Sequence, residues 1–213
     1  DRSEFDLVTP DHRTRALIPL AGAYNVSNAL VAVGCALALE LPLDGIVEGL
    51  AGAEQAPGRL ERVDEGQEFG VYVDYAHTPD ALEKAILAVK GVTPGDVVTV
   101  FGCGGDRDPE KRPMMGEAAG RTSDRVIVTT DNPRTEDPVG IILHIEDGLR
   151  PTGRPYEVEV DRRSAIERAI ASAHPGDSVL IAGKGHEDYQ IFAERTIHFD
   201  DRETAREVLR SQC

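Results

Sequence analysis

The sequence predicts an α/β fold in which helices cover both faces of a mainly parallel, Rossmann-like sheet. Two observations carry this prediction. Short apolar runs alternate with amphipathic stretches from residue 69 onward, and polar or glycine-rich clusters follow those runs. Strands that alternate with helices of about 10–15 residues are typical of βαβ units on a parallel sheet. Apolar runs without polar alternation suit strands that are covered on both faces.

The first predicted strands and helices are delimited by proline and glycine. A β-rich run at 71–74 is followed by Thr78 and Pro79, a favoured pair at the start of a helix, and this helix should end near Gly91. The apolar run 97–101 predicts the next strand, which a glycine-rich segment terminates. A helix through 114–120 then leads to a strand at 125–130.

The remaining elements repeat this order to the end of the chain. We expect a helix near 139–149, a strand near 156–160, a helix at 164–173 and an apolar strand at 178–182, then an edge strand at 196–199 and a final helix at 202–209. In such sheets, ligands bind beyond the carboxyl ends of the strands, where the strand order reverses. The site is therefore predicted at that edge.

The first 57 residues predict a different kind of unit. Residues 17–20 favour a strand, and residues 25–41 and 43–50 favour two helices. Two helices and one strand cannot enclose a core by themselves. We therefore expect residues 1–57 to be a largely helical remnant of a larger domain and 58–213 to form a second domain, with the small residues of 53–59 as the linker.

Composition limits the classes of partner. The 213 residues include 40% hydrophobic and 29% charged residues, which is ordinary for a protein with a core. A formal charge of −15 without a basic run disfavours nucleic acid and anionic membranes as partners. Cys35, Cys103 and Cys213 are odd in number and show no metal-ligand spacing, and no secretion signal opens the chain. We expect a reduced, cytoplasmic protein.

Four polar clusters follow predicted strands, at 74–77, 102–107, 131–134 and 183–187. In the third, Arg134 can grip a carboxylate with two parallel hydrogen bonds, Asn132 can donate to the same carboxylate, and Asp131 can hold the arginine. An ordinary turn around Pro133 explains the same residues equally well.

The second and fourth clusters both combine glycine with charge. The segment 102–107 lets the backbone approach a ligand and ends in Arg107, but it lacks the dinucleotide-binding G-x-G-x-x-G pattern and could be a tight turn. In the segment 183–187, the carbonyl of Gly183 and the carboxylate of Glu187 could bind an ammonium group. A plain turn is the alternative here too.

The remaining candidates suggest a nucleotide. Thr78 and Pro79 are explained as a helix start, which leaves Asp74 and His77 to contact a ribose hydroxyl and a base or phosphate. Asn25 and Asn28 lie three residues apart on one helix face and could read an adenine edge. Asn25 could equally cap that helix.

In this order, the clusters resemble those of the Mur ligases, and within them the MurE branch of UDP-N-acetylmuramoyl-tripeptide synthetases. The similar motifs extend through almost the whole chain: Y-N-V-S-N-A-L at 24–30, P-G-R-L-E at 57–61, V-D-Y-A-H-T-P at 73–79, F-G-C-G-G-D-R-D at 101–108, K-R-P-M-M at 111–115, D-N-P-R at 131–134 and G-K-G-H-E-D-Y-Q at 183–190. Ala23 and Ser27 depart from the basic or aromatic residues that are commoner around Asn25 in the family.

The resemblance implies an ATP- and Mg²⁺-dependent ligase. It would phosphorylate the terminal carboxylate of UDP-N-acetylmuramoyl dipeptide and join it to the amine of meso-diaminopimelate. The D-N-P-R tetrad is the family's marker for meso-diaminopimelate rather than lysine. By the family pattern, this amino acid is bound by Arg107, Asp131, Asn132, Pro133, Arg134, Gly183 and Glu187. Within that set, Asn132 and Arg134 would take the distal carboxylate, Gly183 and Glu187 the distal ammonium, and Arg107 the carboxylate beside the reacting amine.

The resemblance also places part of the machinery elsewhere. Asn25 and Asn28 would contact adenine, whereas Arg59, Asp74 and His77 would face the ribose and phosphates. The family's phosphate loop, magnesium ligands, carbamylated lysine and uridine-nucleotide-binding domain would lie upstream, so no catalytic residue or metal ligand is assigned to this chain. The missing domains are expected partners, with 53–58 as the hinge for domain closure. The chain alone should bind diaminopimelate weakly at best and should not turn over ATP.

Three alternatives remain. A relative in the same superfamily could add lysine, or glutamate to folate, although residues 131–134 argue against this. A nicotinamide-dependent oxidoreductase would share the sheet but lacks its glycine fingerprint. The chain could also act only as a binding module.

Overall fold

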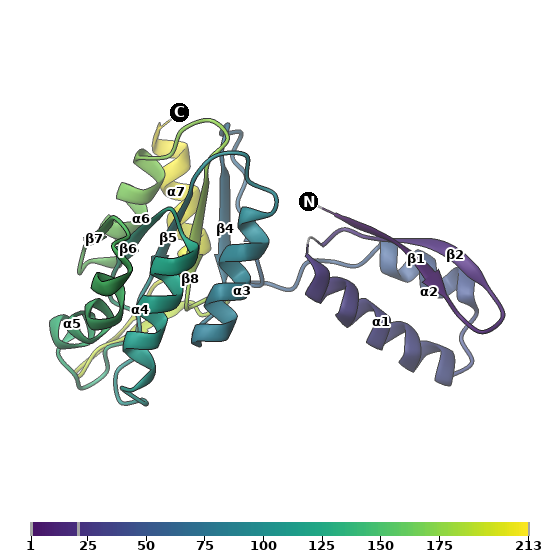
Figure 1. Ribbon diagram of the computed structural model, residues 1–213, viewed down its shortest axis with the longest axis horizontal. Coiled ribbons are helices and arrows are strands. Elements are labelled where there is room, and N and C mark those ends of the chain that lie inside the picture. Colours follow the sequence, from purple (N-terminus) through teal and green to yellow (C-terminus); the bar gives the residue numbers. More distant parts are fainter. Residues whose placement is uncertain (1, 21, 213) are drawn as a thin grey trace. The chain divides into compact units, whose positions relative to one another are not determined.

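The computed structural model describes residues 2–20 and 22–212, which form two compact units with a boundary between Ala56 and Pro57 (Figure 1). The first unit contains two strands and two helices, and the second contains all later elements. None of the helices within the described ranges is both long enough and apolar enough to span a bilayer.

The first unit is built on a β-hairpin, although only one strand was predicted in this region. Strand β1 (Ser3–Val8) pairs antiparallel with β2 (Arg13–Ile18), and helices α1 (Ala23–Ala38) and α2 (Leu43–Ala51) follow. The expected strand at 17–20 is wrong in its bounds, because β2 starts earlier and ends before Pro19. The added strand allows a small core to form from Leu7, Ala16, Val33 and Ile46.

The second unit contains a six-stranded sheet. Its order is β3 (Glu61–Arg62), β4 (Gly70–Asp74), β8 (Ser178–Ala182), β5 (Val97–Phe101), β6 (Arg125–Val128) and β7 (Tyr156–Val158). Only the short edge strand β3 is antiparallel to its neighbour, and all other pairs are parallel. The predicted mainly parallel α/β sheet is confirmed.

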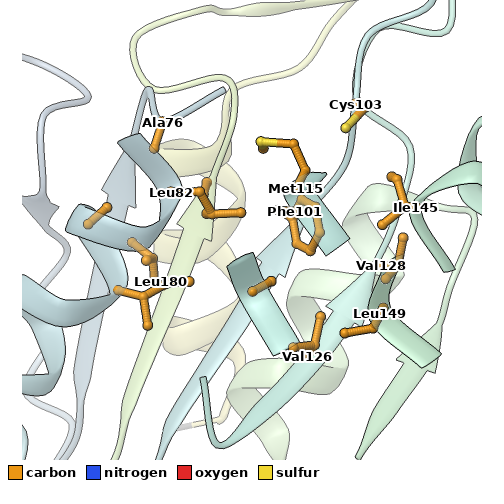
Figure 2. Close-up of a cluster of buried hydrophobic side chains, with 14 of the residues drawn as sticks. Ala76, Leu82, Phe101, Cys103, Met115, Val126, Val128, Ile145, Leu149 and Leu180 are labelled. Atoms are coloured by element: carbon orange, nitrogen blue, oxygen red, sulfur yellow. The ribbon is translucent and has the colours of Figure 1, made fainter. Parts of the chain in front are cut away.

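Helices cover both faces of this sheet because successive strand residues point to opposite sides. Phe101 and Leu180 pack into the core beneath α3 (Pro79–Lys90), α4 (Lys111–Thr122) and α5 (Pro138–Leu149) (Figure 2). Val100 and Ile181, one residue away in sequence, pack beneath α6 (Arg162–Ala171) and α7 (Asp201–Gln212). The completely buried strands β5 and β8 therefore separate two apolar layers.

Polar caps fix the starts of three of these helices. The hydroxyl of Thr78 accepts a hydrogen bond from the amide of Ala81, with Pro79 in the first turn. Asp137 and Asp161 cap α5 and α6 in the same way. A side-chain acceptor at the cap satisfies an amide that has no partner inside the helix.

The last hairpin differs from the prediction. Residues 196–199 were expected to form an edge strand, but β10 (Thr196–His198) pairs with β9 (Tyr189–Ile191) in a separate two-stranded sheet. β9 lies along the segment that follows β6, because Gln190 donates to the carbonyl of Asp131 at 2.8 Å. The predicted strands at 125–130 and 156–160 end at Val128 and Val158 instead.

The strand order places a crevice at the carboxyl ends of the sheet. β8 lies between β4 and β5. The chain leaves β4 and β5 toward helices of the first layer, whereas after β8 it continues to α7 in the second layer. Neighbouring strands whose connections diverge in this way leave a crevice between their ends.

Candidate functional site

A cavity of about 480 Å³ lies at the carboxyl ends of β4, β5, β6 and β8. All four predicted clusters contribute to its wall. It is lined by Tyr75, His77, Thr78, Gly102, Cys103, Gly104, Arg107, Lys111, Asp131, Asn132, Arg134, Gly183, Glu187 and Tyr189. The structure thus brings Arg107, Asn132, Arg134 and Glu187, which lie up to 80 residues apart, to one site.

Glycines allow the loops after β5 and β6 to touch. A Cβ atom on Gly102 would lie 2.2 Å from the carbonyl oxygen of Thr129, and one on Gly105 would lie 1.9 Å from that of Pro133. Because backbone cannot yield to such contacts, no side chain fits at either position. The glycine-rich segment is therefore required for the approach of these two loops.

Asn132 and Glu187 are joined directly across the cavity wall. The amide Nδ2 of Asn132 donates to Oε2 of Glu187 at 2.9 Å, and the buried Nζ of Lys184 donates to Oδ1 of Asn132 at 3.1 Å. The amide of Ile191 donates to the same Oδ1 at 3.0 Å. Lys184 was not predicted as a site residue. Its position between Gly183 and Gly185 was the one sequence feature that could have indicated a special backbone conformation there.

Arg134 is held at the cavity by its own backbone conformation and by carbonyl groups. Its φ of 52° is in the left-handed region, and its amide donates to the carbonyl of Ile191 at 3.0 Å. Its Nη1 donates to the carbonyl of Gly105 at 2.7 Å and lies 3.4 Å from that of Asn132. These contacts fix the plane of the guanidinium group, which can bind a carboxylate in two-point fashion.

A buried arginine connects the loops that follow β5 and β6. Arg112 is 1% exposed, and its Nη2 donates to Oε1 of Glu136 at 2.7 Å. The same oxygen accepts from the amide of Asp106 at 2.6 Å, and Nη1 of Arg112 lies 3.1 Å from Nδ1 of His144. The hydrogen bond from Arg112 lowers the pKa of Glu136. Arg112 thus links the segment after β5 to that after β6, a role that the motif at 111–115 did not reveal.

Cationic and neutral groups complete the wall. Arg107 is exposed, and Nζ of Lys111 donates to the carbonyl of His77 at 3.1 Å. Nδ1 of His77 lies 2.8 Å from the carbonyl of Tyr75, so that nitrogen carries a proton. Burial raises the pKa of the Cys103 thiol to about 12. The cavity therefore combines cations with the carboxylates of its acidic residues, which suits a zwitterionic ligand.

Asp74 and Arg59 lie near one end of this wall. The two carboxylate oxygens of Asp74 accept hydrogen bonds from the amides of Leu60 and Ala76, each at 2.8 Å. Burial raises the pKa of Asp74. The guanidinium of Arg59 lies 4.8 Å from the ring centre of Tyr75, which lines the cavity. Asp74 therefore anchors the segment that enters this unit.

Asn25 and Asn28 belong to the first unit, within helix α1. The alternative that Asn25 caps this helix is wrong, because the helix begins at Ala23 and Gly22 is its capping residue. Asn25 is half-buried and Asn28 is exposed. Across the described ranges of both units, no three His, Cys, Asp or Glu side chains come together as a possible metal site. Of the cysteines, Cys35 is exposed and Cys103 is buried, whereas Cys213 lies outside the described residues.

Comparison with protein families and curated proteins identifies relatives of this chain. The family model described as "Mur ligase, glutamate ligase domain" matches residues 58–185. The UDP-N-acetylmuramoyl-L-alanyl-D-glutamate–2,6-diaminopimelate ligase of Solibacter usitatus is 50% identical over 97% of this chain and 42% of its own length. The ligase of the same name from Gloeobacter violaceus is 52% identical over 95% of this chain and 42% of its length.

Solved structures give the same relationship. A UDP-N-acetylmuramoyl-L-alanyl-D-glutamate–2,6-diaminopimelate ligase superposes with a TM-score of 0.73 at 39% identity, covering 98% of this chain and 43% of that protein. A folylpolyglutamate synthase from Thermotoga maritima shares the fold, with a TM-score of 0.63 at 24% identity over 84% of this chain and 40% of its own. The chain therefore spans about two fifths of the length of the relatives it matches.

Proposed function

Because the chain belongs to the Mur ligase family, we propose that it is the amino-acid-binding part of an ATP-dependent ligase. The complete ligase would add meso-diaminopimelate to UDP-N-acetylmuramoyl-L-alanyl-D-glutamate in peptidoglycan synthesis. The observation that carries the proposal is that Arg134, Asn132 and Glu187 line one cavity. Relatives about 50% identical to the chain, named as 2,6-diaminopimelate ligases, support the choice of amino acid.

The proposed reaction has two steps. ATP transfers its terminal phosphoryl group to the terminal carboxylate of the dipeptide, which gives an acyl phosphate and ADP. The amine of diaminopimelate then attacks the acyl carbon, the bond from carbon to the phosphate oxygen breaks, and the amide forms with release of phosphate and a proton. This chain's contribution is to hold the amine in place, and correct placement alone can supply a large share of a rate enhancement.

The far end of diaminopimelate carries a carboxylate and an ammonium group, and the cavity offers a partner for each. We assign the carboxylate to Arg134 and to the second N–H of Asn132 Nδ2, whose first N–H is donated to Glu187. The ammonium is assigned to Glu187 and the carbonyl of Gly183. Lysine lacks that distal carboxylate, so it would leave Arg134 without its partner.

The other lining residues complete the assignment. Arg107 is proposed to bind the carboxylate beside the reacting amine. Pro133 and Asp131 shape the loop: the carbonyl of Pro133 contacts Gly105, and Oδ2 of Asp131 would lie 2.7 Å from a Cβ atom on Gly183. Their role is to set the positions of the residues that contact the ligand.

The proposed contacts with ATP rest on the resemblance to the Mur ligase family. Arg59 and His77 are proposed to face the phosphates and ribose, and Asn25 and Asn28 the adenine. Asp74 is proposed to act mainly by fixing the backbone at Leu60 and Ala76, since each of its carboxylate oxygens accepts a hydrogen bond from one of these two amides. The described residues present no group of acidic or histidine side chains for Mg²⁺, so no step on the metal is assigned to this chain.

Partners and location follow from the same proposal. The other domains of the ligase, the nucleotide-linked dipeptide and diaminopimelate are the proposed partners, and nucleic acid and membranes are not. We propose the cytoplasm as the location, because the reaction needs ATP and a nucleotide-linked substrate.

The proposal is tested by assaying the complete ligase with the nucleotide-linked dipeptide, ATP and a panel of amino acids. We expect ADP release and a new amide product, seen by mass spectrometry, with meso-diaminopimelate. Lysine or glutamate as the preferred substrate would contradict the proposed amino acid. Saturable binding of a nicotinamide cofactor in a fluorescence titration would favour an oxidoreductase instead.

A further inference from the structure

The side chain of Lys184 is fully buried beneath the cavity wall, with 0% exposure. It lies between Gly183 and Gly185, whose φ angles of 116° and 55° are both left-handed. A Cβ atom on Gly185 would lie 2.6 Å from Cβ of Tyr75, so this close approach also requires glycine. The loop after β8 thus turns a lysine inward, where burial of an ammonium group is costly unless partners receive it.

The partners of Lys184 are two residues proposed to bind the amino acid. Its Nζ lies 3.1 Å from Oδ1 of Asn132 and 3.4 Å from Oε2 of Glu187. It also lies 5.5 Å from the ring centre of Tyr189, another residue of the cavity wall. A single buried cation therefore contacts the segment after β6, the loop after β8 and strand β9.

These contacts determine how Asn132 is oriented. The oxygen and nitrogen of an asparagine amide are alike in shape, so their partners decide which atom points where. Lys184 and the amide of Ile191 both donate to Oδ1, which leaves Nδ2 to face Glu187. Without the lysine, Oδ1 would keep only the donor from Ile191, and Glu187 would lose one of its hydrogen-bond donors.

The local charge also depends on Lys184. Burial lowers the pKa of its ammonium group, whereas the carboxylate of Asp131 raises it. Asp201 and Glu187 are the other carboxylates that act on it, and Arg162 is the second cation. Removal of Lys184 would take away the cation that lies 3.4 Å from the carboxylate of Glu187 and would leave that carboxylate in its partly buried position.

We propose that Lys184 is a positioning residue for amino-acid selection. Its ammonium group holds Asn132 and Glu187 in the orientation that accepts both charges at the far end of diaminopimelate. This inference rests on the proposed function and deepens it. Lys184 touches the groups that bind the ligand and not the reacting atoms, so it acts through binding rather than through the chemical step.

The test is steady-state kinetics of the complete ligase with Lys184→Met, which removes the charge and keeps most of the volume. We expect KM for meso-diaminopimelate to rise by about tenfold or more. KM for ATP and kcat should change by less than about twofold, because uniform binding is lost without loss of transition-state stabilisation. Lys90→Met is the matched control, since Nζ of Lys90 pairs with Asp124 at 2.8 Å and neither residue lines the cavity. It should leave KM for diaminopimelate unchanged.

A double-mutant cycle with Glu187→Gln separates positioning from a general effect on folding. In the Glu187→Gln background, Lys184→Met should raise KM by a clearly smaller factor than in the wild type, because only the contact with Asn132 then remains to be lost. The double variant removes opposite charges together, so it also provides the test if Lys184→Met alone does not fold. Equal losses in both backgrounds would overturn the proposal, as would an unchanged KM for diaminopimelate or an equal rise in KM for ATP.

Failure of this inference differs from failure of the proposed function. A wild-type ligase that does not use diaminopimelate contradicts the proposed function, and the role of Lys184 with it. A wild type that ligates diaminopimelate, together with a Lys184→Met variant that keeps its KM, contradicts the role of Lys184 alone.

Discussion

The side-chain amide of Asn132 donates a hydrogen bond to the carboxylate of Glu187 at 2.9 Å, although 55 residues separate them in the sequence. The bond joins the segment after β6 to the loop after β8. In the proposed function one residue helps to bind a carboxylate and the other an ammonium group. The two charges of a zwitterion would therefore be bound by residues that already fix each other's side chains. Less side-chain conformational entropy is then lost on binding.

Replacement of Arg134 is expected to weaken the binding of diaminopimelate selectively. A hydrogen bond to a charged group contributes about 1.5–3 kcal/mol, so Arg134→Ala in the complete ligase should raise KM for diaminopimelate about 10- to 100-fold. KM for lysine should change little, because lysine has no distal carboxylate. Arg125→Ala is the control, since Arg125 pairs with Glu157 outside the cavity. Parallel losses for both amino acids would argue against the assigned contact.

Removal of Arg162 is expected to destabilise the second unit strongly. Arg162 and Asp201 are both fully buried, and Nε and Nη2 of the arginine donate to the two carboxylate oxygens at 2.8 and 2.7 Å. Nη2 also donates to the carbonyl of Ala182 at 3.0 Å, at the end of β8. Arg162→Met leaves a buried carboxylate without its partner, which costs about 3–5 kcal/mol.

Urea denaturation of this chain measures that cost, with Arg163→Met as the control. Arg163 is the next residue along the helix, but its ion pairs with Glu167 and Glu207 are exposed, and exposed pairs contribute about 0–1 kcal/mol. If both variants lose the same free energy of unfolding, the buried pair does not have the importance assigned to it.

Gly58 is predicted to tolerate no side chain. Its φ is 65°, and a Cβ atom there would lie 2.1 Å from the backbone nitrogen of His186. Gly153 offers a matched comparison, because its φ of 68° is similar but no atom lies within 4 Å of an added Cβ. Gly153→Ala should cost about 1–2 kcal/mol from the left-handed backbone alone. Gly58→Ala should cost clearly more in the same denaturation experiment; equal costs would show that the loop at His186 yields freely.

The result also bears on the expected hinge at 53–58. The amide of Gly58 donates to Glu61 at 2.8 Å, and that of Leu60 donates to Asp74 at 2.8 Å. These contacts tie the segment from Gly58 onward to the second unit. We therefore expect any hinge to lie within 53–57.

The cysteines should differ sharply in reactivity. Only the thiolate reacts with iodoacetamide, and burial raises the pKa of Cys103 to about 12, so at pH 8 its thiolate fraction is on the order of 10⁻⁴. Because deprotonation increases with pH, its labelling should stay slow until the pH approaches 12 or the chain unfolds. Cys35 is exposed and should be labelled before Cys103. Peptide mass spectrometry with and without urea measures the labelling rate of each cysteine. Rapid labelling of Cys103 in the folded chain would contradict the burial assigned to it.

The central strands of the sheet were predictable because each is an apolar run that is too short for a helix and is followed by glycine. Residues 178–182 and 97–101 match β8 and β5, whose side chains are all buried. Strand β1 was missed although Phe5 and Leu7 alternate with acidic residues, which is the period-two signal of a half-buried strand. Strand β9 has only three residues, and its position depends on bonds to Asp131 and Asn132, so local sequence could not reveal it.

The cavity was predictable to a similar extent. Clusters that follow parallel strands must meet at one edge of the sheet, which placed Arg107, Arg134 and Glu187 together. Sequence could not show that Asn132 bonds to Glu187, or that Lys184 points inward, because both depend on distances between loops. Sequence also could not show that Asp74 accepts hydrogen bonds from the amides of Leu60 and Ala76, and its contact with a nucleotide stays a prediction.

The most direct test of the central claim is the ratio of kcat/KM for meso-diaminopimelate to that for L-lysine in the complete ligase. If Arg134 and Glu187 together receive the two distal charges, the ratio should be on the order of 10² or more, because lysine leaves the guanidinium group of Arg134 without its carboxylate partner. A ratio near one would contradict the claim.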